Sequence, residues 1–490
     1  MQRTEVDLPL QLDRADQRPL PVQVADGIRD LVDRGVLRPG ERLPATRPLA
    51  LRWGVARGTV VAGVDQLVAE GYLSPVTGAG TIVNPRLSAV HPGLAAPSRT
   101  RRSPSSSRGT SPGDRSPTAI DLSPGRPDAA RIVDARWREA WRAAAAQVSA
   151  TAPPPAGLPE LRHELASHLR QVRGVLADPS DLLVTTGARD GLALVLQVVA
   201  GHREHAVTVA VEDPGYPSLR RVPARLGARL VEVPVDDDGI EVAALRRLRR
   251  TPDVVIVTPS HQYPLGNSMS ATRRRELLGW AQDHDVVVVE DDYDSELRYV
   301  GAPLPALAAL DRQATPEGRT VITLGSFSKT VTGDLGAGFV YAPRKLVAEL
   351  VRLRADLGGL PSGVVQRALA GYLHSGGLRR HIERMRRDYR RRRLHLIEVL
   401  GDLLRAEVTC MDGGLHAVVH LEPRGRRSAA VRERSVVDGA ARHGVTVTAL
   451  SRYWAHARRT RSYGVVIGYP PLDPDGETAL RVLRDMINSS

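Results

Sequence analysis

The feature that most constrains this fold is an alternation of short apolar runs with helical stretches between Ile120 and about Met486. The runs that predict strands are 182–185, 206–211, 229–233, 254–258, 286–290, 321–324 and 337–341. Strands that alternate with helices are typical of a largely parallel α/β sheet, because parallel strands need a crossover connection. Roughly 370 residues is large for one such layer system, so we expect a large sheet and a smaller C-terminal α/β lobe from about residue 390.

A second feature divides the chain before this region begins. Residues 85–118 are rich in Pro, Ser and Arg and have almost nothing to bury, which predicts a flexible linker. A chain of 490 residues also exceeds one ordinary domain. We therefore predict a first domain over 1–84, a linker over 85–118 and a second domain over 119–490.

Composition narrows the cellular setting. The single cysteine, Cys410, excludes an internal disulfide and fits a reducing compartment. No N-terminal apolar segment and no apolar run near 18 residues is found, so we expect a cytoplasmic protein without a membrane span. The net charge of +13 permits a polyanionic partner, although an arginine-rich proteome would produce a similar value.

The first domain has the plan of a winged helix. Helical patterns over 21–35, 46–53 and about 56–70 precede two strands around a glycine-containing hairpin within 73–83. Between Arg34 and Arg57 there are six arginines and one acid, Glu41. Such a concentration of positive charge on turns and helix starts predicts contacts with DNA phosphates.

This segment resembles the GntR-type DNA-binding domain. The matching residues are Gly35, Leu37, Pro39-Gly40, Leu43-Pro44-Ala45, Arg47, Gly54-Val55-Ala56-Arg57-Gly58-Thr59-Val60, Glu70-Gly71-Tyr72, Gly78 and Gly80-Thr81. The resemblance implies that the third helix enters the major groove of double-stranded DNA. The predicted DNA-binding residues are Arg47, Arg57, Thr59, Gly78 and Gly80. Ala56 and Gly58 depart from the Ser and Asn common in the family, which leaves the operator sequence open.

Lysine usage draws attention to one residue of the second domain. Among 68 Lys and Arg residues only Lys329 and Lys345 are lysines. Lys329 follows the predicted strand 321–324 and the hydroxyl side chains of Ser326 and Ser328. An amine can lose its proton and form a Schiff base with an aldehyde, which a guanidinium cannot do. A surface lysine in a loop is the alternative.

Other predicted strands end in polar groups that suit one cofactor. Gly187 and Ala188 open a helix whose backbone N–H groups favour a phosphate. Tyr216 lies on a turn suited to stacking on a flat ring. Asp291 and Tyr293 follow a run of valines; a carboxylate beside a pyridine nitrogen keeps it protonated, and a phenol can hydrogen-bond the ring oxygen.

These residues resemble the fold-type-I pyridoxal-phosphate enzymes of the aminotransferase class. With the first domain, the whole chain is similar to the MocR subfamily of GntR regulators. The similarity rests on short sequence motifs at 157–162, 211–217, 258–266, 290–299 and 325–330. The resemblance implies pyridoxal 5'-phosphate bound through a Schiff base at Lys329, with a set of neighbours carried over by position. These neighbours are Gly187, Ala188, Ser326 and Ser328 at the phosphate, and Tyr216, His261, Tyr263, Asp291 and Tyr293 at the ring. It also implies Arg452 for an effector carboxylate, a homodimer, and no metal ion.

Two positions depart from this family. Ala152 stands where a phosphate-binding phenol is supplied across the dimer, and Gly336 stands where an arginine follows the lysine by seven residues. A charge-assisted phosphate contact contributes about 1.5–3 kcal/mol. Its loss would weaken cofactor affinity about 10- to 100-fold. Three outcomes stay open: the cofactor is held weakly, is replaced by a related aldehyde phosphate, or is sensed rather than kept.

The sequence thus predicts a transcription factor whose aminotransferase-like domain senses pyridoxal 5'-phosphate, an amine or an amino acid. A working aminotransferase with an accessory DNA-binding head and a cofactor-free scaffold are the alternatives. The arginine-rich stretch 378–393 is helical in pattern; it is either a solvated helix or a second surface facing DNA.

Overall fold

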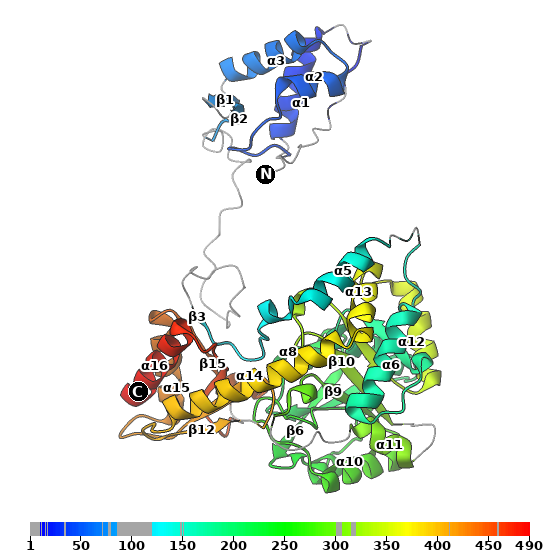
Figure 1. Cartoon of the computed structure of the whole chain (residues 1–490), viewed down its shortest axis with the longest axis vertical. Helices are drawn as coiled ribbons and strands as arrows, with labels where there is room; N and C mark the ends of the chain where they lie inside the picture. Colours follow the sequence, from blue (N-terminus) through cyan, green and yellow to red (C-terminus); the bar gives the residue numbers. More distant parts are fainter. Residues whose placement is uncertain are drawn as a thin grey trace. The chain divides into compact units, whose positions relative to one another are not determined.

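The computed structural model describes residues 10–85, except 11, 15, 17, 34, 35, 71 and 77–79, and residues 120–490, except 148, 150, 300–305, 315–319, 411, 458 and 459. The chain divides into two compact units at residue 111 (Figure 1). The predicted linker lies outside the described residues apart from Pro85. Across the described ranges, no helix combines the length and apolar character needed to cross a membrane.

The N-terminal unit contains three helices and a hairpin. They are α1 (Leu20–Asp33), α2 (Thr46–Trp53), α3 (Arg57–Ala69), β1 (Leu73–Val76) and β2 (Gly80–Val83). The two strands pair antiparallel, with Leu73 opposite Val83. Helix α2 is followed by Gly54, whose φ of 63° is the left-handed conformation that glycine adopts without strain. The predicted winged helix-turn-helix is confirmed.

Apolar residues at helical spacing hold these elements together. Ile28 and Leu31 of α1 pack with Leu49 of α2 and Leu67 of α3 in one buried cluster. Helices α1 and α3 cross closely at Gly63, where a Cβ would lie 2.8 Å from the carbonyl oxygen of Pro21. The core is therefore complete within the unit, which leaves the starts of α2 and α3 free to serve a partner.

An eight-stranded sheet forms the centre of the C-terminal unit, in the order β4-β11-β10-β9-β8-β5-β6-β7. The strands are β4 (Leu182–Thr185), β5 (Thr208–Asp213), β6 (Arg229–Asp236), β7 (Gly239–Ile240), β8 (Val254–Val257), β9 (Val287–Asp292), β10 (Val321–Ser326) and β11 (Gly338–Tyr341). Neighbouring strands from β10 to β6 run parallel, whereas β11 and β7 run antiparallel to their neighbours. The predicted, largely parallel sheet is confirmed.

Helices cover both faces of this sheet (Figure 1). The residues buried on one face include those of α7 (Ala188–Gly201), α8 (Pro217–Arg225) and α12 (Arg344–Leu357). The larger core on the other face includes residues of α6 (Pro159–Arg173), α9 (Val242–Arg246), α10 (Ala271–Asp283), α11 (Leu307–Ala314) and α13 (Gly363–His374), and α5 (Ala135–Ala145) packs on α13. Because both faces are buried, the strands consist of nearly continuous apolar runs.

A second, antiparallel sheet forms the smaller lobe, in the order β12-β13-β16-β15. Its elements are β12 (Ala406–Cys410), β13 (His416–Leu421), α15 (Ala429–Arg442), β14 (Val445–Thr446), β15 (Thr448–Ala449), β16 (Gly464–Gly468) and α16 (Pro474–Ser489). The long helix α14 (Gly377–Leu400) leads into it. One strand of this region comes from far away in sequence: β3 (Ile120–Asp121) pairs in parallel with β14. Sequence reasoning missed that pairing because two residues carry no periodicity.

Candidate functional site

A cavity of about 600 Å³ lies at the edge of the large sheet where the parallel strands end. Its lining residues are Gly125, Arg126, Pro127, Thr186, Gly187, Ala188, Arg189, Asp190, Tyr216, Leu219, Tyr263, Asp291, Tyr293, Ser326, Ser328, Lys329 and Gly333. Nine of the ten residues predicted to bind a cofactor belong to this lining, and His261 does not. They converge because the carboxyl ends of parallel strands meet at one edge, the usual place for ligands in such sheets.

One end of the cavity is built from small residues and hydroxyls. Ser326 ends β10 opposite Gly338 of β11, and Gly338 in turn pairs with Thr185 of β4. A Cβ on Gly338 would lie 2.8 Å from the Cα of Gly187, so this contact requires glycine. The Ser326 hydroxyl donates to the Ser328 hydroxyl at 2.8 Å. Together with the N-terminus of α7, these groups offer several hydrogen-bond donors to an anion.

Lys329 follows directly in the lining. Its Nζ donates a 2.7 Å hydrogen bond to the carbonyl oxygen of Gly125, a residue 204 positions earlier in the chain. Gly125 has a φ of 75°, and a Cβ there would lie 2.7 Å from Nζ. The amine is therefore held at the cavity by one exchangeable bond to a main-chain oxygen. Lys329 is half-buried and lines the cavity, which favours the predicted role over a lysine loose on the surface.

Asp291 is the most unusual group in the cavity. Its side chain is buried, and Oδ1 has no hydrogen-bond partner among the described residues. Burial above all, together with the nearby carboxylates of Asp292 and Asp294, raises the pKa of this carboxyl to about 7, although Lys329 opposes the shift. A buried carboxylate oxygen without a donor is costly. Its position favours a ligand that brings a protonated nitrogen.

Tyr293 presents its phenol to the same space. The hydroxyl donates to the carbonyl oxygen of His261 at 2.8 Å, and burial raises the pKa of the phenol well above its usual value. Tyr293 therefore stays protonated, and its one hydrogen must leave the His261 carbonyl oxygen before it can bond to a ligand. His261, predicted near the ring, lies one layer behind: its ring stacks on that of Tyr293 with centroids 6.1 Å apart.

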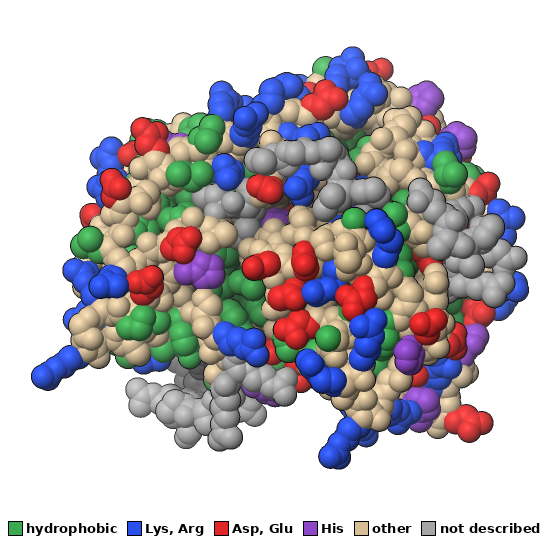
Figure 2. Space-filling model, turned by 90° about the horizontal axis from the view of Figure 1, so that it is seen from below, with side chains coloured by type: hydrophobic (Ala, Val, Ile, Leu, Met, Phe, Trp, Pro, Cys, Tyr) green, Lys and Arg blue, Asp and Glu red, His purple; other side chains and the backbone are tan. Residues whose placement is uncertain are grey.

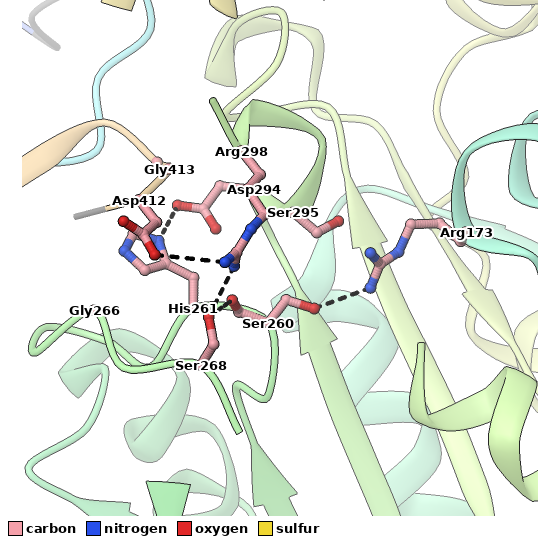
Figure 3. A pocket seen from close by; sticks show the side chains of 11 residues that line it. Arg173, Ser260, His261, Gly266, Ser268, Asp294, Ser295, Arg298, Asp412 and Gly413 are labelled. Atoms are coloured by element: carbon pink, nitrogen blue, oxygen red, sulfur yellow. Dashed lines mark hydrogen bonds and ion pairs between the residues drawn. The ribbon is translucent and has the colours of Figure 1, made fainter. Parts of the chain in front are cut away.

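A polar cluster joins this second layer to the smaller lobe (Figure 3). His261 Nδ1 lies 2.8 Å from Asp294 Oδ2, and Arg298 donates to Ser268 at 2.9 Å while its other nitrogen lies 3.5 Å from Asp412. The turn at Gly414 approaches so closely that a Cβ would lie 2.3 Å from the His261 ring. A shift of the lobe would therefore press on the histidine that supports Tyr293.

Two further tyrosines close one side of the cavity. Tyr216 directly precedes α8 and is exposed, and its ring meets the buried ring of Tyr263 edge-on at 5.2 Å. The Tyr263 hydroxyl lies 3.3 Å from that of Tyr453 in the smaller lobe. A flat ligand can lie against the exposed face of Tyr216 because the edge-on neighbour leaves that face free.

Some predicted residues lie elsewhere. Arg452 is exposed on the short helix Leu450–Tyr453 and does not line the cavity, so its carboxylate role stays a prediction. Gly336 and Ala152 are exposed and also absent from the lining. The sequence analysis missed Arg126 and Arg189, which do line it. The position of Arg189, directly after Ala188 at the predicted phosphate-binding helix start, was the signal that could have revealed it.

The N-terminal unit presents unpaired basic side chains. Arg42, Arg47 and Arg57 are exposed, and none forms an ion pair within the described part of the unit. Arg57, the first residue of α3, donates to the Thr46 hydroxyl at 3.4 Å, which brings it beside Arg47.

The remaining predicted DNA contacts lie close to these arginines or outside the described chain. Thr59 lies in the first turn of α3. The Arg42 guanidinium lies against Gly80 in the hairpin, while Gly78 falls outside the described residues. Ala56 precedes α3 without a side-chain cap, as its identity predicts. The start of α3 and the hairpin form the candidate DNA surface.

Comparisons with known proteins match both units. Residues 20–83 match the bacterial regulatory proteins of the gntR family, and residues 117–461 match aminotransferase class I and II. The chain is 42% identical over 469 residues to the HTH-type pyridoxine biosynthesis transcriptional regulator PdxR of Corynebacterium glutamicum, covering 96% of each protein. It is 32% identical to the probable rhizopine catabolism regulatory protein MocR of Rhizobium meliloti, covering 98% of this chain and 94% of that protein.

Solved structures resemble the C-terminal unit. An archaeal alanine:glyoxylate aminotransferase has a TM-score of 0.67 at 23% identity and covers 76% of this chain and 91% of its own. LysN, an alpha-aminoadipate aminotransferase of Thermus thermophilus solved with N-(5'-phosphopyridoxyl)-L-leucine, has a TM-score of 0.66 at 25% identity, with 76% and 93% covered. The predicted fold-type-I aminotransferase fold is confirmed.

This fold class implies pyridoxal 5'-phosphate, and the residues present fit it. The unpartnered oxygen of Asp291 suits a protonated ring nitrogen, and the glycine-lined end beside Ser326 suits a phosphate. A DNA-binding head and an aminotransferase-like body in one polypeptide also match the relatives over nearly their whole length. The chain is a transcriptional regulator that belongs to the MocR-type branch of the GntR family.

Proposed function

We propose that this regulator binds pyridoxal 5'-phosphate through Lys329 and changes its affinity for operator DNA in response. The observation that carries the proposal is the convergence of Lys329 and Asp291 on one cavity, although they lie 38 positions apart in the printed sequence. Strands β9 and β10 bring them together, because Leu324 pairs with Asp291 in the parallel register. A reactive amine and a buried acid at opposite ends of one small ring are what this cofactor requires.

Each lining residue has a separate task in this proposal. Ser326, Ser328 and the backbone N–H groups of Gly187 and Ala188 bind the phosphate. Asp291 holds the proton on the ring nitrogen, and Tyr293 hydrogen-bonds the ring oxygen.

Tyr216 packs on the ring face and excludes water from it. When bound, the cofactor supplies an aldehyde to which amines add and a ring that accepts electrons. Lys329 supplies the amine, and its hydrogen bond to Gly125 must open first.

Two effectors remain within this proposal: pyridoxal 5'-phosphate itself, or an amine or amino acid that adds to it. The relative named for pyridoxine biosynthesis supports the first, since it is 42% identical over 96% of the chain. The polar cluster behind Tyr293 supports a response in either case. Ligand contacts at Tyr293 reach the smaller lobe through His261 and Gly414, so the ligand can favour one lobe position over another.

We further propose that a cytoplasmic homodimer presents two winged helices to one operator. Arg47, Arg57 and Thr59 then contact the DNA from α2 and α3, and the hairpin at Gly80 reaches the minor groove. Two positions of the smaller lobe would set two spacings between the winged helices of the dimer. Each spacing would give a different affinity for the operator. Sedimentation of the full chain tests the dimer, because a monomer at all concentrations would contradict it.

A spectral titration tests the sensing proposal. Adding pyridoxal 5'-phosphate to the full chain should produce a visible absorbance band that Lys329→Ala abolishes and Lys345→Ala retains. An operator selected from random duplexes should then show a cofactor-dependent gel shift. A band that survives in Lys329→Ala, or operator affinity indifferent to saturating cofactor, would contradict the proposal.

A working aminotransferase is the second candidate. The observation that favours it is that the cavity keeps the amine, the ring acid and the ring phenol together. Incubation with an amino acid and a keto acid distinguishes the two functions. Many turnovers of new keto acid per chain would favour an enzyme, whereas a single stoichiometric spectral change would favour a sensor.

A further inference from the structure

Arg189 is a cation without a partner at the cavity. It lines the site as the second residue of α7, yet it makes no hydrogen bond or ion pair with any described residue. A basic side chain in the first turn of a helix opposes the positive end of the helix dipole, which costs free energy unless an anion lies there. The exposed guanidinium of Arg189 therefore stands where a bound anion would be favourable.

The neighbouring acid does not offset this charge. Asp190 Oδ2 accepts a 2.6 Å hydrogen bond from Arg354, whose side chain is buried, and another of 2.8 Å from the backbone N–H of Thr186. Arg354 is itself fixed by the carbonyl oxygens of Gly358 and Gly359, at 2.8 and 3.0 Å. Asp190 is thus engaged away from Arg189, and the start of α7 keeps an excess of positive charge.

The other arginine of the lining is already paired. Arg126 lies 2.6 Å from the carboxylate of Asp121, so its charge is largely offset. At the opposite end of the cavity, the buried and unpartnered oxygen of Asp291 points to a cationic ring nitrogen. These two ends orient one ligand: its positive group lies at Asp291, and its negative group lies at the start of α7.

We infer that Arg189 supplies the cationic contact to the cofactor phosphate that Gly336 cannot make. The inference rests on the proposed function and changes one expectation derived from the sequence, namely that the glycine leaves the phosphate weakly held. Gly336 is exposed outside the lining, whereas Arg189 is one residue from the backbone N–H groups that face the phosphate. The positive charge at the phosphate would thus come from the start of α7, after β4, and not from the loop after Lys329.

The contribution of the phosphate to binding affinity can be distinguished from that of the ring by comparing pyridoxal 5'-phosphate with pyridoxal. Both are titrated against the full chain by absorbance, with the wild type, Arg189→Gln, Arg189→Lys and the control Arg225→Gln. Arg225 is an exposed arginine in the last turn of α8 and lies outside the cavity, so its variant makes the same change of charge. The measured quantity is the ratio of the two affinities.

Arg189→Gln should weaken the phosphorylated ligand about 10- to 100-fold and leave pyridoxal within about threefold, because one charge-assisted contact is lost. The affinity ratio of Arg189→Lys should lie between those of the wild type and Arg189→Gln, and the ratio of Arg225→Gln should match that of the wild type. An unchanged ratio in Arg189→Gln, or an equal loss for both ligands, would overturn the inference while the wild-type titration still supports cofactor binding. A wild type that binds neither ligand would overturn the proposed function, and this inference with it.

Discussion

The two units handle charge in opposite ways. In the N-terminal unit, the exposed arginines at the starts of α2 and α3 have no acidic partner among the residues that the structure describes, whereas Arg29, away from them, pairs with Glu70 at 2.5 Å. In the C-terminal unit, two buried arginines are matched by acids: Arg173 lies 2.6 Å from Asp292, and Arg354 is bonded to Asp190. One face of the molecule shows basic and acidic side chains interspersed (Figure 2).

This difference in charge pairing indicates which kind of ligand each unit is expected to bind. Charge left unmatched on the surface of the small unit suits a long polyanion, whose many phosphates each need one cation. At the cavity of the large unit, the buried Oδ1 of Asp291 and the exposed guanidinium of Arg189 have no partner among the described residues, which suits one small ligand with two poles. Paired charges elsewhere serve the fold, so substitutions at paired and unpaired groups should have different consequences.

The largest expected effect comes from breaking a buried pair. Arg173→Met leaves the carboxylate of Asp292 buried without its 2.6 Å partner, and we expect a loss of about 3–5 kcal/mol in the stability of the C-terminal unit. Chemical denaturation followed by tryptophan fluorescence measures it, since four of the five tryptophans lie in that unit. Arg225→Gln, an exposed arginine, serves as the control. Equal stability of the two variants would contradict the structural role of the pair.

A smaller effect should come from the unpaired acid. The pKa of Asp291 is raised to about 7, so the folded state keeps a proton that the unfolded chain releases near pH 4. Stability without cofactor should therefore fall as the pH rises through this window, by on the order of 2–3 kcal/mol between about pH 5 and about pH 8.

Asp291→Asn should remove that part of the fall and also weaken cofactor binding. Denaturation of both proteins at the two pH values measures the difference. Glu212, whose buried carboxyl also has a pKa of about 7, keeps part of the slope in both proteins. Parallel slopes for the wild type and the variant would contradict an unpaired acid at position 291.

Removing an unpaired surface cation should change binding and leave folding intact. Arg57→Ala should weaken DNA binding about 5- to 20-fold and reduce the slope of log affinity against log salt by about one. Fluorescence anisotropy on a labelled duplex at several salt concentrations measures both quantities. An unaltered slope would show that Arg57 does not face a phosphate.

The smallest effect should come from the paired surface cation of the same unit. Arg29→Ala breaks an ion pair between partly exposed side chains, worth at most about 1 kcal/mol, and removes no predicted DNA contact. Its DNA affinity should stay within about twofold of the wild type in the same anisotropy assay. A loss as large as that of Arg57→Ala would mean that pairing does not separate structural from DNA-facing arginines.

Much of the fold followed from local pattern. Strand 182–185 was predicted with its observed bounds, and helix α2 likewise. Lys329, Asp291 and Tyr293 were recognised as a site because each lies at the end of a buried strand or within a few residues after it, and such strand ends share one edge of a parallel sheet. The same reasoning could not place Arg452 or His261, whose positions depend on how the smaller lobe packs.

The sequence by itself determined the kinds of element, the winged head and the chemistry gathered at the strand ends, because apolar period and residue type act over a few neighbouring residues. Only the tertiary structure decided that β11 enters between β4 and β10, that β3 joins the distant lobe, and that Gly125 meets Lys329. It also decided that Arg189 faces the cavity while Asp190 is held by Arg354. These outcomes depend on contacts between residues far apart in the chain, which no local pattern encodes.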